Sequence, residues 1–336
     1  MGHSLFQDQF YQFACSSPKA LPSQMPSPLF TIVIPYFNRA QFLPATLASL
    51  RQLTYRPLRV LLVDNHSTDT SPALCREFAE QHSAPDFSIR LLEQPKPGAA
   101  AARNTGLAQV ETPYVYFFDS DDLLSPTFFD DVAALLSQQT TSKQVDMLTL
   151  TTRMTFPDGR SVLRRPRPST SAVEQVLTGM LSTQSVVWRT AFLRNIGGWN
   201  ESVMVWNDWE LGLRALLANP TMRILPQEGY HQIQQHAQSI TGETFSSRLP
   251  QLLHSFSQAE QAAHNHPTIL QALDGRRLIL AGHIHHEGNS QEAAQLRAQV
   301  LSRRTTWRWH LFATYCFRIR KAAWQIYTLL FAAAKM

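Results

Sequence analysis

The chain has 336 residues, of which 44% are hydrophobic and 16% are charged. This composition allows a large buried core, so it excludes a wholly disordered chain and predicts one sizeable domain with an appended region. The formal net charge of +5 is too small to indicate nucleic-acid binding by itself. Cys15, Cys75 and Cys316 form no CxxC pair, which argues against a zinc site or disulfide scaffold and favours a reducing compartment.

The first 28 residues predict a flexible leader. Four prolines lie among serines there, at positions 18, 22, 26 and 28. The segment has no charged stretch followed by an apolar one, so we expect no secretory signal.

Residues 29–245 alternate short β-rich runs with helical segments. The runs are LFTIVI, LRVLLV, SIRLLE and PYVYFF, and the helices predicted after them are Ala40–Gln52, Pro72–Gln81, Gly98–Val110 and Pro126–Gln138. This alternation predicts an α/β fold with a mixed, mainly parallel sheet flanked by helices. The run VDMLTLTTRMTF is followed by Pro157-Asp158-Gly159, which is turn chemistry and predicts a hairpin.

Residues 246–336 are rich in Gln, Ala, Leu and His, and predict a helical C-terminal region with a basic tail. No acidic residue follows Glu292. Two stripes of residues at helical spacing predict one amphipathic helix. The polar stripe consists of His310, Thr314, Arg318, Lys321, Gln325 and Thr328. The apolar stripe consists of Phe312, Tyr315, Ile319, Ala323, Ile326 and Leu330.

Two interpretations of this tail stay open. With Trp307, Trp309 and Trp324 near the borders of its faces, it is typical of an interfacial membrane helix. The alternative is a helix that packs on the domain with its basic side in water. The apolar run 322–334 is shorter than the roughly 20 residues of a spanning helix, so we expect no membrane span. The nearby histidines at 283, 285 and 286 have no carboxylate or cysteine spaced to complete a metal site.

Carboxylates follow two of the predicted strands directly. PYVYFF leads into Asp119-Ser120-Asp121-Asp122, at the end of a parallel strand where open α/β sheets bind ligands. An Asp-x-Asp spacing predicts a Mg²⁺ or Mn²⁺ site that takes diphosphate oxygens, although one carboxylate could instead cap the next helix. LRVLLV ends at Asp64, and Asp69 of the same segment could serve either a ligand or the turn before Pro72.

The order of these motifs resembles the inverting glycosyltransferase family 2, which has the GT-A fold, over about residues 30–241. The matching segments are TIVIPYFNRAQFLPATLASL, VLLVDNHSTDTS, PGAAAARNTGL, YVYFFDSDDLLSP, GGWNESVMVWNDWELGLRAL and YHQIQQHAQSIT. Each segment alone is a weak match to the family, but the order and spacing of the segments together are specific for it. The resemblance implies an enzyme that uses a nucleotide-sugar donor with Mn²⁺ or Mg²⁺.

The resemblance also implies roles for the donor side of the site. Carried over by position, it places Pro35 and Phe37 in the nucleobase pocket, Asp64 on the base, and Arg103 beside the donor. Asp119 would lie near the ribose and the metal ion. Asp121 would bind the metal directly, and His236 would lie near the diphosphate and the metal.

On the acceptor side, the family's catalytic base lies in an acidic pair that opens a helix after a Gly-Gly-aromatic stretch. The corresponding residues here are Asn207-Asp208, so Asp208 is the candidate base. Asn207 replaces the usual Glu, and Asn65 replaces a second Asp found in many relatives. Trp206 and Trp209 flank the pair and would either stack on a sugar or pack in the core.

We therefore expect a cytoplasmic protein, either free or peripheral on the cytoplasmic face of the membrane, that transfers a sugar with inversion to a saccharide or lipid-linked saccharide. Asp208 would take the acceptor's proton. Two alternatives stay open, a sugar nucleotidyltransferase and a non-catalytic, membrane-associated polysaccharide-binding module. The first lacks a Gly-rich, basic loop after the first strand, and metal-dependent nucleotide binding would separate the second from both enzymes.

Overall fold

A computed structural model of the chain describes residues 27–138, 144–156, 158–166, 170–234, 244–319 and 322–331. The predictions for residues 1–26 of the leader and for His236 lie outside these ranges and stay predictions.

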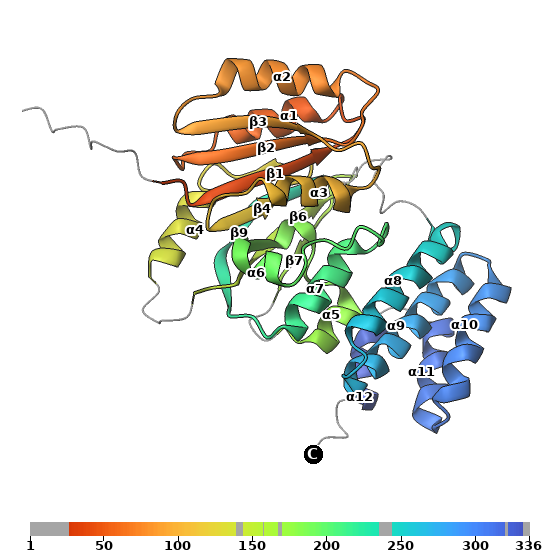
Figure 1. Ribbon diagram of the computed structural model, residues 1–336. Helices are drawn as coiled ribbons and strands as arrows, with labels where there is room; N and C mark the ends of the chain where they lie inside the picture. The colour runs from red at the N-terminus through yellow and green to blue at the C-terminus, as the bar shows by residue number, and fades with distance from the viewer. Residues whose placement is uncertain are drawn as a thin grey trace, which may run out of the picture.

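A nine-stranded mixed sheet organises the first two thirds of the chain (Figure 1). In spatial order its strands are β3 (Phe87–Glu93), β2 (Leu58–Asp64), β1 (Phe30–Tyr36), β4 (Tyr114–Phe117), β8 (Val186–Arg189), β6 (Met147–Thr155), β9 (Met222–Gln234) and β5 (Leu123–Leu124), with β7 (Ser161–Arg164) paired to β6. The first four strands are parallel, as are β6 and β9, whereas β5, β7 and β8 pair antiparallel to their neighbours. The β6–β7 pair confirms the predicted hairpin, although Pro157 lies outside the described residues.

Apolar cores lie on both faces of the sheet. Phe30, Ile32 and Ile34 of β1 contribute to one core. It also receives side chains from α1 (Leu43–Arg51), α2 (Ser71–His82) and α4 (Phe128–Ser137). Val33 contributes to the other, with α3 (Ala99–Ala108), α6 (Thr190–Asn195) and α7 (Asn207–Leu217). β1 is buried along its whole length, as expected for a parallel strand covered on both faces, and the predicted α/β class is confirmed.

The small residues of α3 let this helix lie close to β1. A Cβ atom added to Gly106 would lie 2.3 Å from Cγ1 of Val33, so a larger side chain would force the helix away. Arg103, almost one turn earlier in the same helix, is buried. The close approach of α3 thus holds a buried guanidinium near the carboxyl ends of the strands.

The C-terminal helices form a third core with α5 (Ala172–Thr178) and α7. They are α8 (Leu249–Ala262), α9 (Pro267–His286), α10 (Ser290–Arg303), α11 (Trp307–Arg318) and α12 (Ala323–Phe331), and they gather at one end of the molecule (Figure 1). The core includes Val176, Leu177, Trp209 and Leu213 from before residue 246. The predicted boundary between residues 245 and 246 follows the last strand and stays a prediction, but the core crosses it.

The prediction of one continuous amphipathic helix in the tail is wrong. The chain leaves the helical conformation between α11 and α12, where Ala322 has a φ of 55°. Trp309, Phe312 and Cys316 of α11 are buried in the third core. The backbone of Cys316 lies against Gly282 of α9. The predicted stripes therefore fall on two short helices, both of which contribute to the third core. None of the helices in the described part of the chain is long and apolar enough to span a bilayer.

Candidate functional site

The loops after β1 and β2 are joined by hydrogen bonds. The side-chain oxygen of Asn38 accepts from the backbone N–H of Thr68 at 2.8 Å, and Oδ2 of Asp69 accepts from that of Ala40 at 3.1 Å. Burial acts to raise the pKa of Asp69, but hydrogen bonds from Ser71 and Ala40 outweigh it and leave the pKa below its usual value. Asp69 therefore braces these two loops, as the turn interpretation expected.

The predicted nucleobase residues lie beside these loops. Pro35 is buried within β1, whereas the Phe37 side chain, just beyond the strand, is 52% exposed. Asp64 ends β2 and accepts a hydrogen bond from the backbone N–H of Ser67 at 3.0 Å. Phe37 and Asp64 thus lie at the carboxyl ends of two neighbouring strands, where a planar base could contact both an aromatic ring and a carboxylate.

Asn65 fixes the loop between β3 and α3. Its Nδ2 donates to the carbonyl oxygens of Gln94 at 2.9 Å and Lys96 at 2.8 Å, and its Oδ1 accepts from the backbone N–H of Gly98 at 2.7 Å. An aspartate has no N–H with which to make the first two bonds. The amide is thus required by the local structure, which gives a physical reason for this departure from the family pattern.

The three carboxylates after β4 lie in different surroundings. Asp119 accepts hydrogen bonds from Nη2 of Arg103 at 2.9 Å and from Nε2 of Gln184. Oδ2 of Asp121 lies 3.8 Å from Nε of Arg39. Asp122 is only 1% exposed, and its Oδ2 lies 2.7 Å from Nε2 of His231. Burial raises the pKa of Asp122 to about 6, and the adjacent histidine limits that rise.

Arg103 joins the carboxylate loop to the start of α7. Its Nη2 binds Asp119, and its Nη1 donates to Oδ1 of Asn207 at 3.4 Å. The guanidinium also lies over the ring of Trp199, 4.4 Å from the ring centroid. Arg103 and Asp119 are thus in contact, and Asn207 acts as an acceptor for the same arginine.

The candidate base Asp208 lies in the first turn of α7. Its Oδ1 accepts from the backbone N–H of Trp209 at 2.8 Å, and its side chain is partly exposed. Trp206 precedes the helix in a left-handed conformation with a φ of 59°. Its ring contacts Trp209, Phe245 and Phe256 and the guanidinium of Arg276, 4.7 Å away.

The two flanking tryptophans differ. Trp209 is buried, and its Nε1 donates to the carbonyl oxygen of Val176 at 3.0 Å, so it packs in the core. Trp206 is only partly buried and keeps a surface that could meet a ligand.

Among the predicted metal ligands, the described part of the chain contains the carboxylates of Asp119 and Asp121. No group of three His, Cys, Asp or Glu side chains placed to hold a metal ion occurs within the described ranges. Mg²⁺ is commonly held by one or two carboxylates, with phosphate oxygens and waters as its other ligands. Asp119 and Asp121 fit that donor chemistry, and the predicted third ligand, His236, lies outside the described residues.

Sequence reasoning missed Gln184, His231 and Tyr116. Oη of Tyr116 donates to the carbonyl oxygen of Gln184 at 2.8 Å and lies 2.5 Å from Nδ1 of His231. Tyr116 and His231 lie within two of the segments that match the family, but nothing in those segments distinguishes them. The folding of the sheet and of the turn before β8 brings the three residues to the carboxylates.

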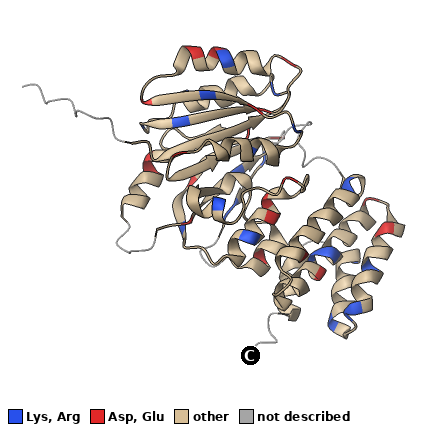
Figure 2. Cartoon of the chain, in the orientation of Figure 1, with Lys and Arg blue, Asp and Glu red and all other residues tan. Residues whose placement is uncertain are grey.

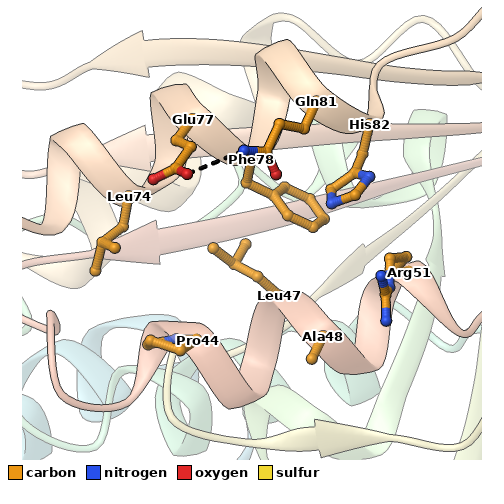
Figure 3. A pocket seen from close by; sticks show the side chains of 9 residues that line it. All are labelled: Pro44, Leu47, Ala48, Arg51, Leu74, Glu77, Phe78, Gln81 and His82. Atoms are coloured by element: carbon orange, nitrogen blue, oxygen red, sulfur yellow. Dashed lines mark hydrogen bonds between the residues drawn. The ribbon is translucent and has the colours of Figure 1, made fainter.

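Two cavities lie away from these residues. One of about 210 Å³ lies between α1 and α2, where Leu47, Leu74 and Phe78 face one another and Gln81 donates to Glu77 (Figure 3). Another of about 580 Å³ is lined partly by Arg59 and Arg90. Neither is lined by a predicted site residue.

Comparisons with known proteins identify a family and proteins of similar fold. The model of the family "Glycosyl transferase family 2" matches residues 31–181. Over 255 residues the chain is 24% identical to "Uncharacterized glycosyltransferase EpsJ" of Bacillus subtilis, which covers 71% of this chain and 70% of EpsJ. Three curated relatives at 36%, 32% and 30% identity align over only 14%, 38% and 29% of their own lengths.

Solved structures share the fold. TarS of S. aureus in complex with UDP has a TM-score of 0.57 at 17% identity, and the match covers 91% of this chain and 90% of that one. Mannosyltransferase PcManGT from Pyrobaculum calidifontis, in complex with GDP-Man and Mn²⁺, has a TM-score of 0.54 at 18% identity, covering 92% and 88%. The predicted GT-A type fold is therefore confirmed.

The bracing role of Asn65 is tested by Asn65→Asp, which keeps the size of the side chain. The new carboxylate would face two carbonyl oxygens without a donor, so we expect the free energy of unfolding to fall by about 1–3 kcal/mol. Urea unfolding monitored by circular dichroism measures this. The control is Asn265→Asp, which adds the same charge in an exposed turn before α9. Equal stability of both variants would contradict the bracing role.

Proposed function

We propose that the chain transfers a sugar from a nucleoside diphosphate sugar to an acceptor hydroxyl with inversion, since the model of glycosyl transferase family 2 matches residues 31–181. The observation that carries the proposal is the position of Arg103. It binds Asp119 of the carboxylate loop and Asn207 at the start of α7, so the proposed donor and acceptor sides of the site meet at one residue. The family match favours glycosyl transfer over a nucleotidyltransferase or a binding module.

On the donor side, Pro35, Phe37 and Asp64 would hold the nucleobase, and Asp119 the ribose. Asp121 would hold a Mn²⁺ or Mg²⁺ ion together with Asp119 and His236. Such an ion, when bound, supplies positive charge that stabilises the diphosphate as it leaves. The Mn²⁺ in the mannosyltransferase with the same fold supports this choice of metal.

On the acceptor side, Asp208 would accept the proton of the acceptor hydroxyl. The hydroxyl oxygen then forms a bond to the anomeric carbon as the bond from that carbon to the diphosphate oxygen breaks. Attack from the face opposite the leaving group inverts the anomeric configuration. The first turn of α7 suits a carboxylate, because the helix N-terminus stabilises its negative charge.

The donor and acceptor classes draw support from similar proteins. UDP is bound in the TarS structure, and GDP-Man in that of the mannosyltransferase. A relative 29% identical over 198 residues, from Staphylococcus epidermidis, is a teichoic acid poly(glycerol phosphate) polymerase. These support a nucleoside diphosphate donor and a surface-polymer or lipid-linked saccharide acceptor.

Nucleotide binding tests the donor site. We expect calorimetric titration with UDP, GDP, CDP and dTDP to show one preferred nucleotide whose binding requires Mn²⁺. Asp121→Asn should weaken that binding by more than about tenfold, since a metal ligand is lost. The control Asp130→Asn changes an exposed carboxylate on α4 and should bind like the unmodified chain. Failure of the unmodified chain to bind any of the four nucleotides would overturn the proposed function.

Catalysis tests Asp208. With the donor identified above and a panel of saccharide acceptors, Asp208→Asn should lower kcat by about 10²- to 10⁴-fold, because the general base is lost. Its donor affinity should stay within about twofold of the unmodified value. Glu174→Gln, which also changes a carboxylate in the first turn of a helix, is the matched control. Full activity of Asp208→Asn would exclude it as the base.

We also propose that the tail touches an anionic membrane surface, at the cytoplasmic face. Trp307 and Leu311 lie on one side of α11 and are 67% and 50% exposed, Ile319 directly after this helix is 55% exposed, and Leu329 of α12 is 70% exposed. No acidic residue follows Glu292, so the only charged side chains near these apolar ones in sequence are basic (Figure 2). Exposed apolar side chains among basic ones suit anionic lipid.

Vesicle sedimentation tests this membrane contact without deleting helices that belong to the core. Binding to vesicles of phosphatidylserine and phosphatidylcholine should fall more than about tenfold in the double variant Trp307→Ser, Leu311→Ser, because two large side chains are lost from the contact. Val162→Ser removes a similarly exposed side chain on β7 and serves as the control. Unchanged sedimentation of the double variant would exclude the membrane contact.

A further inference from the structure

Buried polar side chains link the two ends of the carboxylate loop. Tyr116 of β4 and His231 of β9 are fully buried, and Asp122 is nearly so. Gln184, in the 3-10 turn Thr183–Ser185, lies between them and the other end of the loop. Buried polar groups of this kind are costly to leave unpaired, and each of these has a partner.

The links can be followed from one carboxylate to the other. Nε2 of Gln184 donates to Oδ2 of Asp119, and the carbonyl oxygen of Gln184 accepts from Oη of Tyr116 at 2.8 Å. The same Oη lies 2.5 Å from Nδ1 of His231, whose Nε2 lies 2.7 Å from Oδ2 of Asp122. Asp119 and Asp122 are therefore tied together through β4, β9 and the turn before β8.

Proton counting fixes the direction of these bonds. A phenol has one proton, and the carbonyl oxygen of Gln184 can only accept it, so Tyr116 must in turn accept from Nδ1–H of His231. Nε2 of His231 and the carboxyl group of Asp122 then share one further proton. Whichever of the two carries it, the hydrogen bond between them remains.

The histidine ring is also held by packing. Its centroid lies 5.3 Å from that of Phe118 and 6.0 Å from that of Tyr116, both in edge-to-face geometry. A ring that is fixed by two hydrogen bonds and two aromatic neighbours has a single orientation. The hydrogen bond from this ring therefore holds the Asp122 side chain in place.

We propose that His231 is a positioning residue, which with Tyr116 and Gln184 fixes the carboxylate loop so that Asp121 meets the metal-bound diphosphate. This rests on the proposed function. Asp121 lies between two anchored carboxylates, so the backbone that carries it is held from both sides. Groups that orient a metal ligand commonly change metal affinity by about 10–100-fold when they are removed.

The test measures Mn²⁺ affinity by calorimetry in the presence of the preferred nucleotide. Tyr116→Phe removes one oxygen atom from the linked side chains and keeps the ring that packs on Phe128 and Phe129. We expect it to weaken Mn²⁺ binding by about tenfold or more. Tyr230→Phe is the matched control, since that hydroxyl binds Asp131 at 2.7 Å, outside the linked side chains. Melting temperatures compare the stability of the two variants.

Two substitutions of His231 separate positioning from packing. His231→Gln keeps an amide that can make one of the two bonds, whereas His231→Leu makes neither. Mn²⁺ affinity should therefore fall in the order unmodified chain, His231→Gln, His231→Leu. If His231→Leu fails to fold, Tyr116→Phe decides alone.

The outcomes distinguish this inference from the proposed function. An unmodified chain that binds nucleotide with Mn²⁺, together with a Tyr116→Phe variant that binds Mn²⁺ within twofold of it, would overturn the inference alone. Nucleotide binding that needs no Mn²⁺ would also overturn it. An unmodified chain that binds no nucleotide would overturn the proposed function, and the inference falls with it.

Discussion

The site depends on one buried guanidinium. Arg103 binds Asp119 and lies within reach of Asn207, so it joins the end of β4 to the start of α7 across about a hundred residues of sequence. Its burial is tolerated because Asp119 balances its charge and Trp199 covers its face. Removing that charge would leave the Asp119 carboxylate without its cationic partner. The small residues of α3, above all Gly106, are what allow this arginine to lie so close to the sheet.

Much of the fold could be predicted from the sequence, because its apolar runs are long and their order is simple. The four strand–helix units and the hairpin after β6 were predicted close to their observed bounds. The carboxylates after PYVYFF were found for the same reason, since the end of a buried parallel strand has a fixed place in such a sheet. Their individual surroundings, such as the deep burial of Asp122, were not evident from their spacing.

What could not be predicted depends on contacts between distant segments. His231 lies in a strand whose neighbours, β5 and β6, are set by tertiary pairing with a register shift, so its partners leave no local signal. The break between α11 and α12 was missed because the spacing of polar and apolar residues along 310–330 carries no sign of the left-handed backbone at Ala322. The amide of Asn65 was noticed only as a departure from the family, and its reason lies in the loop before α3.

The left-handed backbone at Trp206 has a consequence for how family members diverge. A tryptophan holds that conformation at a cost of roughly 1–3 kcal/mol, which its surroundings must offset. Here they include Phe245, Phe256 and Arg276, all from the C-terminal third of the chain. Substitutions at these three positions would therefore change the contacts that hold Trp206, the residue before Asn207-Asp208, in its left-handed conformation. The segment from Phe245 through α9 and the start of α7 should therefore change together, and a chimera that replaces this segment with a relative's helices should lose the contacts that hold Trp206.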